Sequence, residues 1–222
     1  MRFKDVFSII GPAMVGPSSS HTAGAARIGR LARQLFGAMP ARADVIFYGS
    51  FAATYIGHGT YSAIVGGLLD METDDIRLPD SLRIAAEAGI LVEVQTGKGL
   101  FPHPNTAELR LYREHEEEPS FTIVGTSIGG GNIEIVSVDG FKVKLTGQYP
   151  TLVIWHTDSP GMIAEVTRLL QEEGINIGYM SVDRKNRSGQ AMMAIETDQA
   201  ISAELLEKLN GYPGIQAIRL VK

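Results

Sequence analysis

The spacing of hydrophobic and polar positions predicts a helix-rich beginning of the chain and a β-rich remainder. Up to Gly89, apolar side chains recur mostly every three to four positions, as on one face of an amphipathic helix. The helices expected from this spacing cover residues 1–10, with Phe3, Val6, Phe7 and Ile10 on one side, and residues 23–37, 60–69 and 79–88. One apolar run, from Asp44 to Tyr48, predicts a short strand that passes into a helix at Gly49-Ser50.

After Gly89 the pattern changes to short alternating or β-rich segments, separated by Gly, Pro, Asn or acidic residues as strand connections are. The expected strands cover residues 90–95, 107–112, 121–126, 133–138 and 141–145. The run from Gly129 to Gly131 precedes a strand rather than a helix, so it is not a dinucleotide-binding fingerprint. It predicts either a tight turn or a close approach of the backbone to a ligand or a partner chain.

A second cycle of elements begins after residues 147–150, which have the composition of a linker. Its expected strands cover residues 152–155, 175–182, 192–196 and 215–220, and its expected helices cover residues 162–173 and 202–209. This βαββαβ order is the ferredoxin-like arrangement. We therefore expect a mixed α/β (α+β) chain with two domains, residues 1–147 and residues 148–222.

The composition argues against several classes of protein. The chain has 222 residues, 44% hydrophobic and 20% charged, with a net charge of −5 and no basic stripe of the kind that binds nucleic acid. It lacks an apolar run of about 18 residues, so we expect no transmembrane helix. Its beginning does not have the pattern of a secretory signal, and we expect a cytoplasmic protein.

Cysteine is absent from the sequence. This excludes disulfides, a thiolate nucleophile, and an iron–sulfur or cysteine-based zinc site of the usual kind built by this chain alone. The 5 histidines show no His-Glu-x-x-His or comparable spacing, so no metal site is expected in this chain.

The stretch Gly16-Pro-Ser-Ser-Ser-His-Thr22 has the most distinctive chemistry in the chain. Three hydroxyls and an imidazole lead directly into the expected helix 23–37, and Ser20 or Thr22 is expected to cap it. A helix N-terminus with unpaired N–H groups and nearby hydroxyls is a natural site for a carboxylate or a phosphate. The alternative is an ordinary helix cap that follows a polar loop.

Two further segments combine a histidine with residues that shape the backbone. His58 lies between Gly57 and Gly59, where a ligand can approach the backbone closely. His103 and Asn105 lie in a proline-rich loop that restrains where their side chains point. Either segment could also serve only to turn the chain.

Five motifs, in this order along the chain, resemble the β subunit of iron–sulfur-dependent L-serine dehydratases. They are the run Ile9–Ile28 and the segments Tyr48–Thr54, Gly57–Thr60, His103–Thr106 and Ser127–Gly131. Farther on, Asp158-Ser-Pro-Gly161 and Gly174-Ile-Asn-Ile177 resemble an ACT domain, a small regulatory module that often senses amino acids. One position departs from the pattern: Tyr61 follows Gly-His-Gly-Thr where members of the family usually carry Asp.

The resemblance implies a role in the conversion of L-serine to pyruvate and ammonia. This reaction needs a base for the weakly acidic α-proton and a Lewis acid that helps hydroxide to leave. Because this chain has no cysteine, the resemblance further implies that a separate α subunit holds a [4Fe–4S] cluster. The two chains would form a heterodimer with a shared active site.

The same resemblance assigns roles to residues of the motifs. It favours His58 as the general base and His21 as a second catalytic group that orients the substrate carboxylate. The other implied substrate-binding residues are Ser18, Ser19, Ser20, Thr22, His103 and Asn105. For the ACT domain it implies an effector amino acid bound by Asp158, Gly161 and Asn176, and self-association by pairing with another ACT domain.

Two other functions compete with an enzyme subunit. The chain could be a stand-alone regulatory protein whose N-terminal motifs bind serine allosterically, as a resemblance to the substrate-sensing domains of phosphoglycerate dehydrogenases suggests. A pyridoxal-phosphate enzyme is a weaker alternative, because no lysine lies in a recognisable cofactor setting. A neighbouring gene for a cysteine-bearing α chain would favour the enzyme subunit.

Overall fold

A computed structural model describes residues 12–99, 101, 103–187 and 189–221. The predicted helix 1–10 lies outside the described residues. The contacts divide the chain into two compact units between Gly140 and Phe141, and each unit is treated by itself. The domain limits 1–147 and 148–222 stay predictions.

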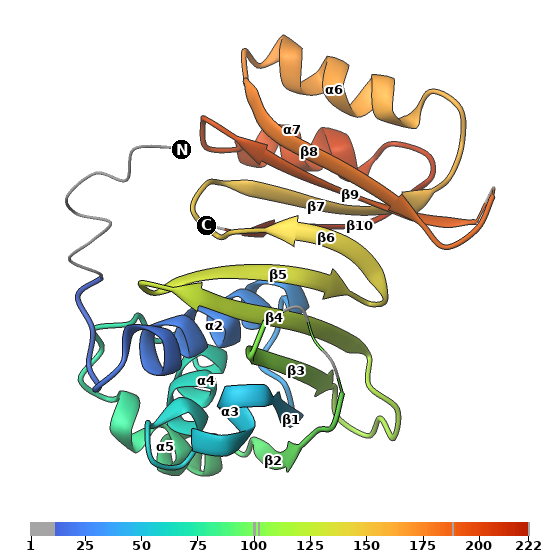
Figure 1. The fold of residues 1–222 in the computed structure, drawn as a ribbon. Helices are drawn as coiled ribbons and strands as arrows, with labels where there is room; N and C mark the ends of the chain where they lie inside the picture. The colour runs from blue at the N-terminus through green and yellow to red at the C-terminus, as the bar shows by residue number, and fades with distance from the viewer. Residues whose placement is uncertain (1–11, 100, 102, 188, 222) are drawn as a thin grey trace. The chain divides into compact units, whose positions relative to one another are not determined.

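The N-terminal unit contains a sheet whose strands lie in the order β2-β1-β3-β4-β5 (Figure 1). The strands are β1 (Arg42–Tyr48), β2 (Leu91–Thr96), β3 (Asn105–Tyr112), β4 (Phe121–Gly129) and β5 (Asn132–Val138). Strand β1 runs parallel to β2, and the other neighbours are antiparallel. All five agree with the strands predicted from hydrophobic alternation, apart from shifts at their ends.

The predicted helices 23–37, 60–69 and 79–88 and the helix after Gly49-Ser50 are present in this unit, and η1 (Ser19–Ala23) is an additional turn that the sequence did not predict. The other helices are α2 (Gly24–Phe36), α3 (Gly49–Thr54), α4 (Thr60–Leu68), η2 (Leu78–Asp80) and α5 (Ser81–Glu87). Helix α2 ends at Gly37, whose φ of 77° is the left-handed conformation that terminates many helices. Helix α2 packs on β3, β4 and β5, and α4 packs on α2 (Figure 1).

Two glycines allow α2 and α4 to approach each other closely. A Cβ atom added at Gly29 of α2 would overlap the carbonyl of Ile64 in α4, and one added at Gly67 of α4 would overlap the carbonyl of Ala26 in α2. The helices therefore meet backbone against backbone at this crossing. This helix crossing also places the segment that leads into α2 relative to the segment that leads into α4.

The C-terminal unit has the predicted βαββαβ order. Its elements are β7 (Thr151–Thr157), α6 (Met162–Glu172), β8 (Ile177–Arg184), β9 (Gln190–Thr197), α7 (Ala203–Asn210) and β10 (Ile215–Val221). The four strands form an antiparallel sheet in the order β10-β7-β9-β8. Apolar residues of β7, β9, β10 and both helices, among them Ile154, Val166 and Leu205, form one buried core.

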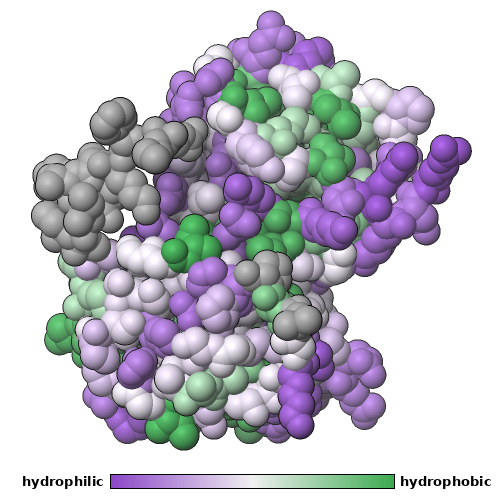
Figure 2. Space-filling view, viewed as in Figure 1, coloured by the Kyte–Doolittle hydropathy of each residue, from purple (hydrophilic) through white to green (hydrophobic). Residues whose placement is uncertain are grey.

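Strand β6 (Phe141–Leu145) lies with the C-terminal unit. The Lys142 N–H donates to Asp183 Oδ2 at 2.7 Å, and the Thr146 hydroxyl donates to Glu196 Oε1 at 3.1 Å. The turn between β8 and β9 is hydrophilic and exposed, with Arg184, Lys185 and Arg187 at the surface (Figure 2). Among the helices of the described part of the chain, none is long and apolar enough to cross a membrane.

Candidate functional site

Three polar segments of the N-terminal unit converge where β1 ends. Strand β1 passes at Tyr48 into Gly49-Ser50, and β3 begins opposite at Asn105, so that Gly49 and Asn105 pair as an isolated bridge. The turn before α2 and the loop before α4 reach the same place through hydrogen bonds and ring contacts of His21. The sequence motifs that carry Ser18–Thr22, Ser50, His58 and Asn105 thus form one site.

The turn before α2 is wider than an ordinary helical turn. The Gly24 N–H donates to the Ser19 carbonyl, an i to i+5 bond of the kind that defines a π-helix. Ser18 caps this turn, because its Oγ accepts the His21 backbone N–H at 3.1 Å. The prediction that Ser20 or Thr22 caps the helix is therefore wrong: the π turn starts the helix earlier and places both residues inside it.

Thr22 has a structural contact in the site. It is 5% exposed, and its hydroxyl donates to the His58 carbonyl at 3.1 Å. This bond ties the π turn to the loop that carries His58. Ser19 and Ser20 lie in the first turn and are only half-buried, so their side chains are more accessible than that of Thr22.

His21 is held on both ring nitrogens. Its Nε2 lies 3.1 Å from Ser50 Oγ, and its Nδ1 lies 3.4 Å from Ser18 Oγ. The Phe51 ring contacts the His21 ring edge to face, with 5.3 Å between the two centroids. Burial, and secondly the neighbouring His58, lower the pKa of His21 below its ordinary value of 6.5. His21 is therefore neutral at neutral pH.

His58 presents its ring beside His21 at the surface. The two ring centroids are 5.0 Å apart, with the planes at 89°. His58 is exposed, and Gly57 and Gly59 on either side have open space where a Cβ would point. An exposed imidazole between two glycines, which have no side chains to cover it, can reach a small substrate.

His103 and Asn105 form a second polar cluster, joined to the first through Ser50. The Asn105 N–H donates to His103 Nδ1 at 3.2 Å, and Asn105 Nδ2 donates to the Ser127 carbonyl at 3.4 Å. The Ser50 N–H donates to the Pro104 carbonyl at 2.7 Å. The predicted site residues of the first domain are thus brought into two adjoining clusters.

Ser50, Phe51 and Ser127 are site residues to which the sequence reasoning gave no role. Ser50 and Phe51 lie in the motif that follows β1. Gly49, whose φ is 57°, could have indicated from the sequence that the backbone turns sharply next to them. Ser127 is fully buried, and its Oγ has no hydrogen-bond partner among the described residues. It packs against Gly24, where a Cβ would overlap the hydroxyl.

The glycine run between β4 and β5 is a turn. Gly129, Gly130 and Gly131 all have positive φ, from 61° to 98°, which agrees with the tight-turn prediction. A Cβ on Gly131 would lie 2.6 Å from Pro12 Cγ, and the Gly131 carbonyl accepts a bond from Arg27 at 2.9 Å. The groups that approach Gly131 closely are thus Pro12 and Arg27 of this chain.

Tyr61 is part of the packing between α4 and its neighbours. Its ring packs against the buried cluster of Val65, Ala85 and Ile90, and burial raises the pKa of its phenol. The position where relatives usually carry Asp is thus filled here by a side chain that contributes to the packing of α4 near α5.

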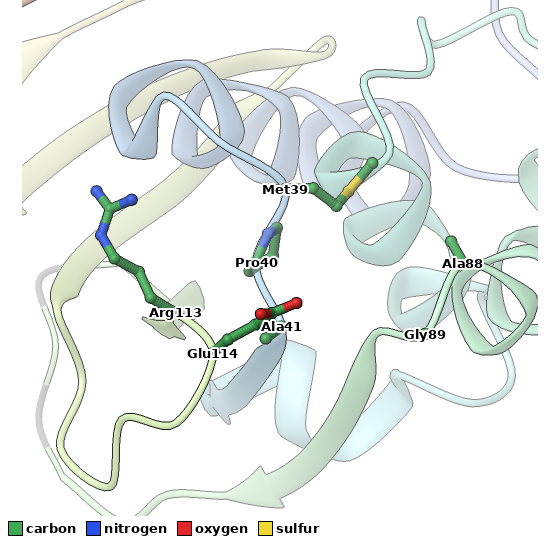
Figure 3. Close-up of a pocket in the computed structure, with 7 residues that line it drawn as sticks. All are labelled: Met39, Pro40, Ala41, Ala88, Gly89, Arg113 and Glu114. Atoms are coloured by element: carbon green, nitrogen blue, oxygen red, sulfur yellow. The ribbon is translucent and has the colours of Figure 1, made fainter.

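Two surface pockets border the N-terminal unit. One of about 240 Å³ includes Thr22, His58 and Gly59 in its lining and adjoins the histidine pair. The larger, about 340 Å³, is lined by Met39, Pro40, Ala41, Ala88, Gly89, Arg113 and Glu114 (Figure 3). It lies where β1 begins and β3 ends, at the opposite end of the sheet from the predicted site residues.

The predicted ligand residues of the C-terminal unit lie at two ends of α6. Asp158 and Gly161 precede α6, and Asp158 Oδ2 accepts a bond from Arg184 Nη1 at 3.1 Å. Asn176 follows α6, and its side chain donates to Asp198 Oδ2 at 2.7 Å. The 11 residues of α6 separate its two ends by about 16 Å at the rise per residue of a helix. One copy of the unit therefore does not bring Asn176 to the N-terminus of α6.

Metal ligands do not cluster in the described part of the chain. No group of three or more His, Cys, Asp or Glu side chains there is arranged so that it could hold a metal ion. Imidazoles and hydroxyls are groups for acid–base and hydrogen-bonding chemistry, and the site built from His21, His58 and the serines offers both.

Comparisons with known proteins match both parts of the chain. The family "Serine dehydratase beta chain" matches residues 3–89, and the family "ACT domain" matches residues 151–214. The "Probable L-serine dehydratase, beta chain" of Bacillus subtilis is 48% identical over 97% of this chain and 96% of its own length. The L-serine dehydratase β chain of Peptoniphilus asaccharolyticus is 34% identical over 97% of both chains.

A different enzyme is similar to less of the chain. The D-3-phosphoglycerate dehydrogenase of Methanocaldococcus jannaschii is 32% identical over 105 residues, which are 47% of this chain and 20% of that enzyme. The likeness to L-serine dehydratase β chains, by contrast, extends over nearly the whole length of both proteins compared.

Proposed function

This chain belongs to the serine dehydratase β-chain family, and we propose that it supplies the acid–base and substrate-binding groups of an active site that an iron–sulfur α subunit completes. It is an L-serine dehydratase subunit with a C-terminal ACT domain. The observation that carries the proposal is the meeting of His21 and His58, with centroids 5.0 Å apart, at a turn of hydroxyl and N–H groups.

His58 is the proposed general base. Loss of ammonia from L-serine starts with removal of the α-proton, and imidazole has a pKa suited to that step. His58 is exposed and therefore accessible to a substrate. The proton removed from Cα moves to His58, while His21 stays neutral because burial and the neighbouring imidazole lower its pKa.

The π turn is the proposed carboxylate site. The N–H groups at the start of a helix lack intrahelical partners and attract anions. Ser19, Ser20 and His21 lie in this turn, and Ser18 precedes it as its cap, with its side chain hydrogen-bonded to that of His21. His103 and Asn105 would bind the same substrate from the adjoining cluster.

The residues of this chain do not fit the ligation of a [4Fe–4S] cluster. Such clusters are held mainly by cysteine thiolates, and the sequence contains none. We therefore assign the cluster to the α subunit and expect a heterodimer. A cytoplasmic location stays a prediction from the sequence.

The isolated chain is expected to be colourless, iron-free and inactive on L-serine. The single chain is purified anaerobically, and its iron and sulfide contents are measured. Pyruvate formation from L-serine is then measured before and after the α chain is added. Turnover only in the mixture supports the proposal. Stoichiometric iron and sulfide in the single chain, or pyruvate formation without α, contradicts it.

We further propose that the ACT unit binds an amino acid at the N-terminus of α6. Gly161 there has φ of 91° and open space where its Cβ would be. In calorimetry of the full chain with L-serine and other amino acids, Gly161→Val should remove one binding event. Gly140→Val is the matched control, since Gly140 also has positive φ and open space but lies in the β5–β6 turn.

If Gly161→Val and the unmodified chain give the same heats of binding with every amino acid tested, this effector site is contradicted. Because Asn176 lies at the other end of α6, a site that uses both Asn176 and Gly161 requires a second copy of the unit. Light scattering with and without the bound amino acid would then detect the self-association.

A stand-alone regulatory protein is the second candidate function. The partial likeness to D-3-phosphoglycerate dehydrogenases favours it. Failure of the chain to co-purify with any cysteine-bearing α chain, together with serine binding by the single chain, would support this alternative.

A further inference from the structure

We propose that Ser50 is a positioning residue of the dehydratase reaction, which fixes the His21 ring and joins the histidine pair to the His103–Asn105 loop. This inference rests on the proposed function of His21 and His58. Ser50 lies outside the turn that contains His21, 29 positions farther along the chain, and acts through that histidine.

The first support is the pair of hydroxyls on the His21 ring. Ser50 Oγ lies 3.1 Å from Nε2, and Ser18 Oγ lies 3.4 Å from Nδ1. One hydroxyl can donate to the unprotonated nitrogen while the other accepts from the protonated one. Phe51 against the ring restricts its rotation, and the tautomer follows from which of the two hydroxyls donates.

The second support is the way in which the backbone holds Ser50. Its N–H donates to the Pro104 carbonyl at 2.7 Å, and Gly49 beside it pairs with Asn105. Gly49 has φ of 57°, and a Cβ there would overlap the Pro104 carbonyl. Ser50 is therefore fixed by the loop that carries His103 and Asn105, and its hydroxyl transmits that position to His21.

A fixed neutral His21 matters for the direction of proton transfer. When His58 takes the α-proton it becomes cationic, and a second cation 5.0 Å away would oppose this step. The low pKa of His21 agrees with a ring that stays neutral. Ser50 then keeps the His21 nitrogens aimed in constant directions while the charge develops on His58.

The test compares Ser50→Ala, Ser50→Thr and the control Thr54→Val. Thr54 lies in the same short helix, and its hydroxyl donates to the Ser50 carbonyl at 2.8 Å rather than to the His21 ring. In the two-chain enzyme, Ser50→Ala should lower kcat by about 10- to 100-fold with KM changed less than about threefold, as expected when a reacting group is misplaced. Ser50→Thr should restore most of kcat, and Thr54→Val should change it little.

A second readout does not depend on turnover. Nitrogen-15 NMR of the isolated chain should show one tautomer of the His21 ring, titrating below pH 6.5, in the unmodified protein and in Ser50→Thr. Ser50→Ala should give a mixture of tautomers. If Ser50→Ala fails to fold by circular dichroism, Ser50→Cys removes the strong hydrogen bond at similar volume and replaces it in both experiments.

Unchanged kcat in Ser50→Ala, or an unchanged His21 tautomer, would overturn the positioning role. Loss of activity that appears in KM alone would overturn it too, because that pattern indicates ground-state binding. Failure of the proposed function is distinguishable: His58→Ala would then retain turnover in the same assay, whatever the NMR of His21 shows.

Discussion

His58→Ala is expected to lower the turnover of the two-chain enzyme by about 10²- to 10⁴-fold, the usual cost of losing a general base. The folded chain should tolerate the change, because His58 is exposed and lies in a loop between two glycines. The measurement is the kcat of pyruvate formation by the reconstituted enzyme, with the cluster spectrum recorded in parallel. Assembly and spectrum should both be preserved.

His115→Asn is the matched control for His58→Ala. His115 is also exposed and lies in a loop, and its φ of 64° is a conformation that Asn accepts. The control should keep full turnover. Near-normal kcat in His58→Ala would place the base elsewhere, with His21 as the first residue to examine.

Gly67→Val is expected to destabilise the N-terminal unit by about 3 kcal/mol, the upper part of the range for overpacked cores. The added Cβ would overlap the carbonyl of Ala26, a backbone atom that cannot rotate away. Since the π turn leads into α2 and the His58 loop leads into α4, separating these helices should also reduce turnover. Urea denaturation followed by far-ultraviolet circular dichroism measures the loss.

Gly211→Val serves as the control for the glycine substitution. Gly211 has φ of −77°, and the nearest atoms to its added Cβ are 3.6 Å away, an ordinary contact. We expect a change within about 0.5 kcal/mol, as for most surface substitutions. Trp155 in β7, the only tryptophan, reports the unfolding of the C-terminal unit separately by fluorescence. Equal stability of the two variants would contradict the tight helix crossing.

Local patterns were sufficient to predict most of the helices and strands. Helix 23–37 follows from apolar positions at helical spacing and from the glycine that ends it, and both act within a few residues. The βαββαβ order of the C-terminal unit follows in the same way from alternating strands and capped helices. The motif around residues 16–22 indicated the right place for chemistry because its residue types are themselves the reactive groups.

Local patterns did not predict the geometry of the helix start or the contacts between segments that are distant in the sequence. The cap at Ser18 depends on a π turn, which bonds Gly24 to Ser19 and which residue preferences for ordinary caps do not foresee. The hydrogen bond between His21 and Ser50 joins residues 29 positions apart. Such contacts are missed because the sequence gives the order of the elements but not the path between them.

The sequence by itself determined the two-part α/β architecture, the family, and the histidines and hydroxyls available for catalysis. Only the tertiary structure decided that His21 meets His58, that Ser50 holds the His21 ring, and that Thr22 ties the two segments together. The physical reason is the crossing of α2 and α4 at Gly29 and Gly67, where two backbones touch. That contact between residues 38 positions apart, not any local preference, fixes the spacing of the segments that carry the site.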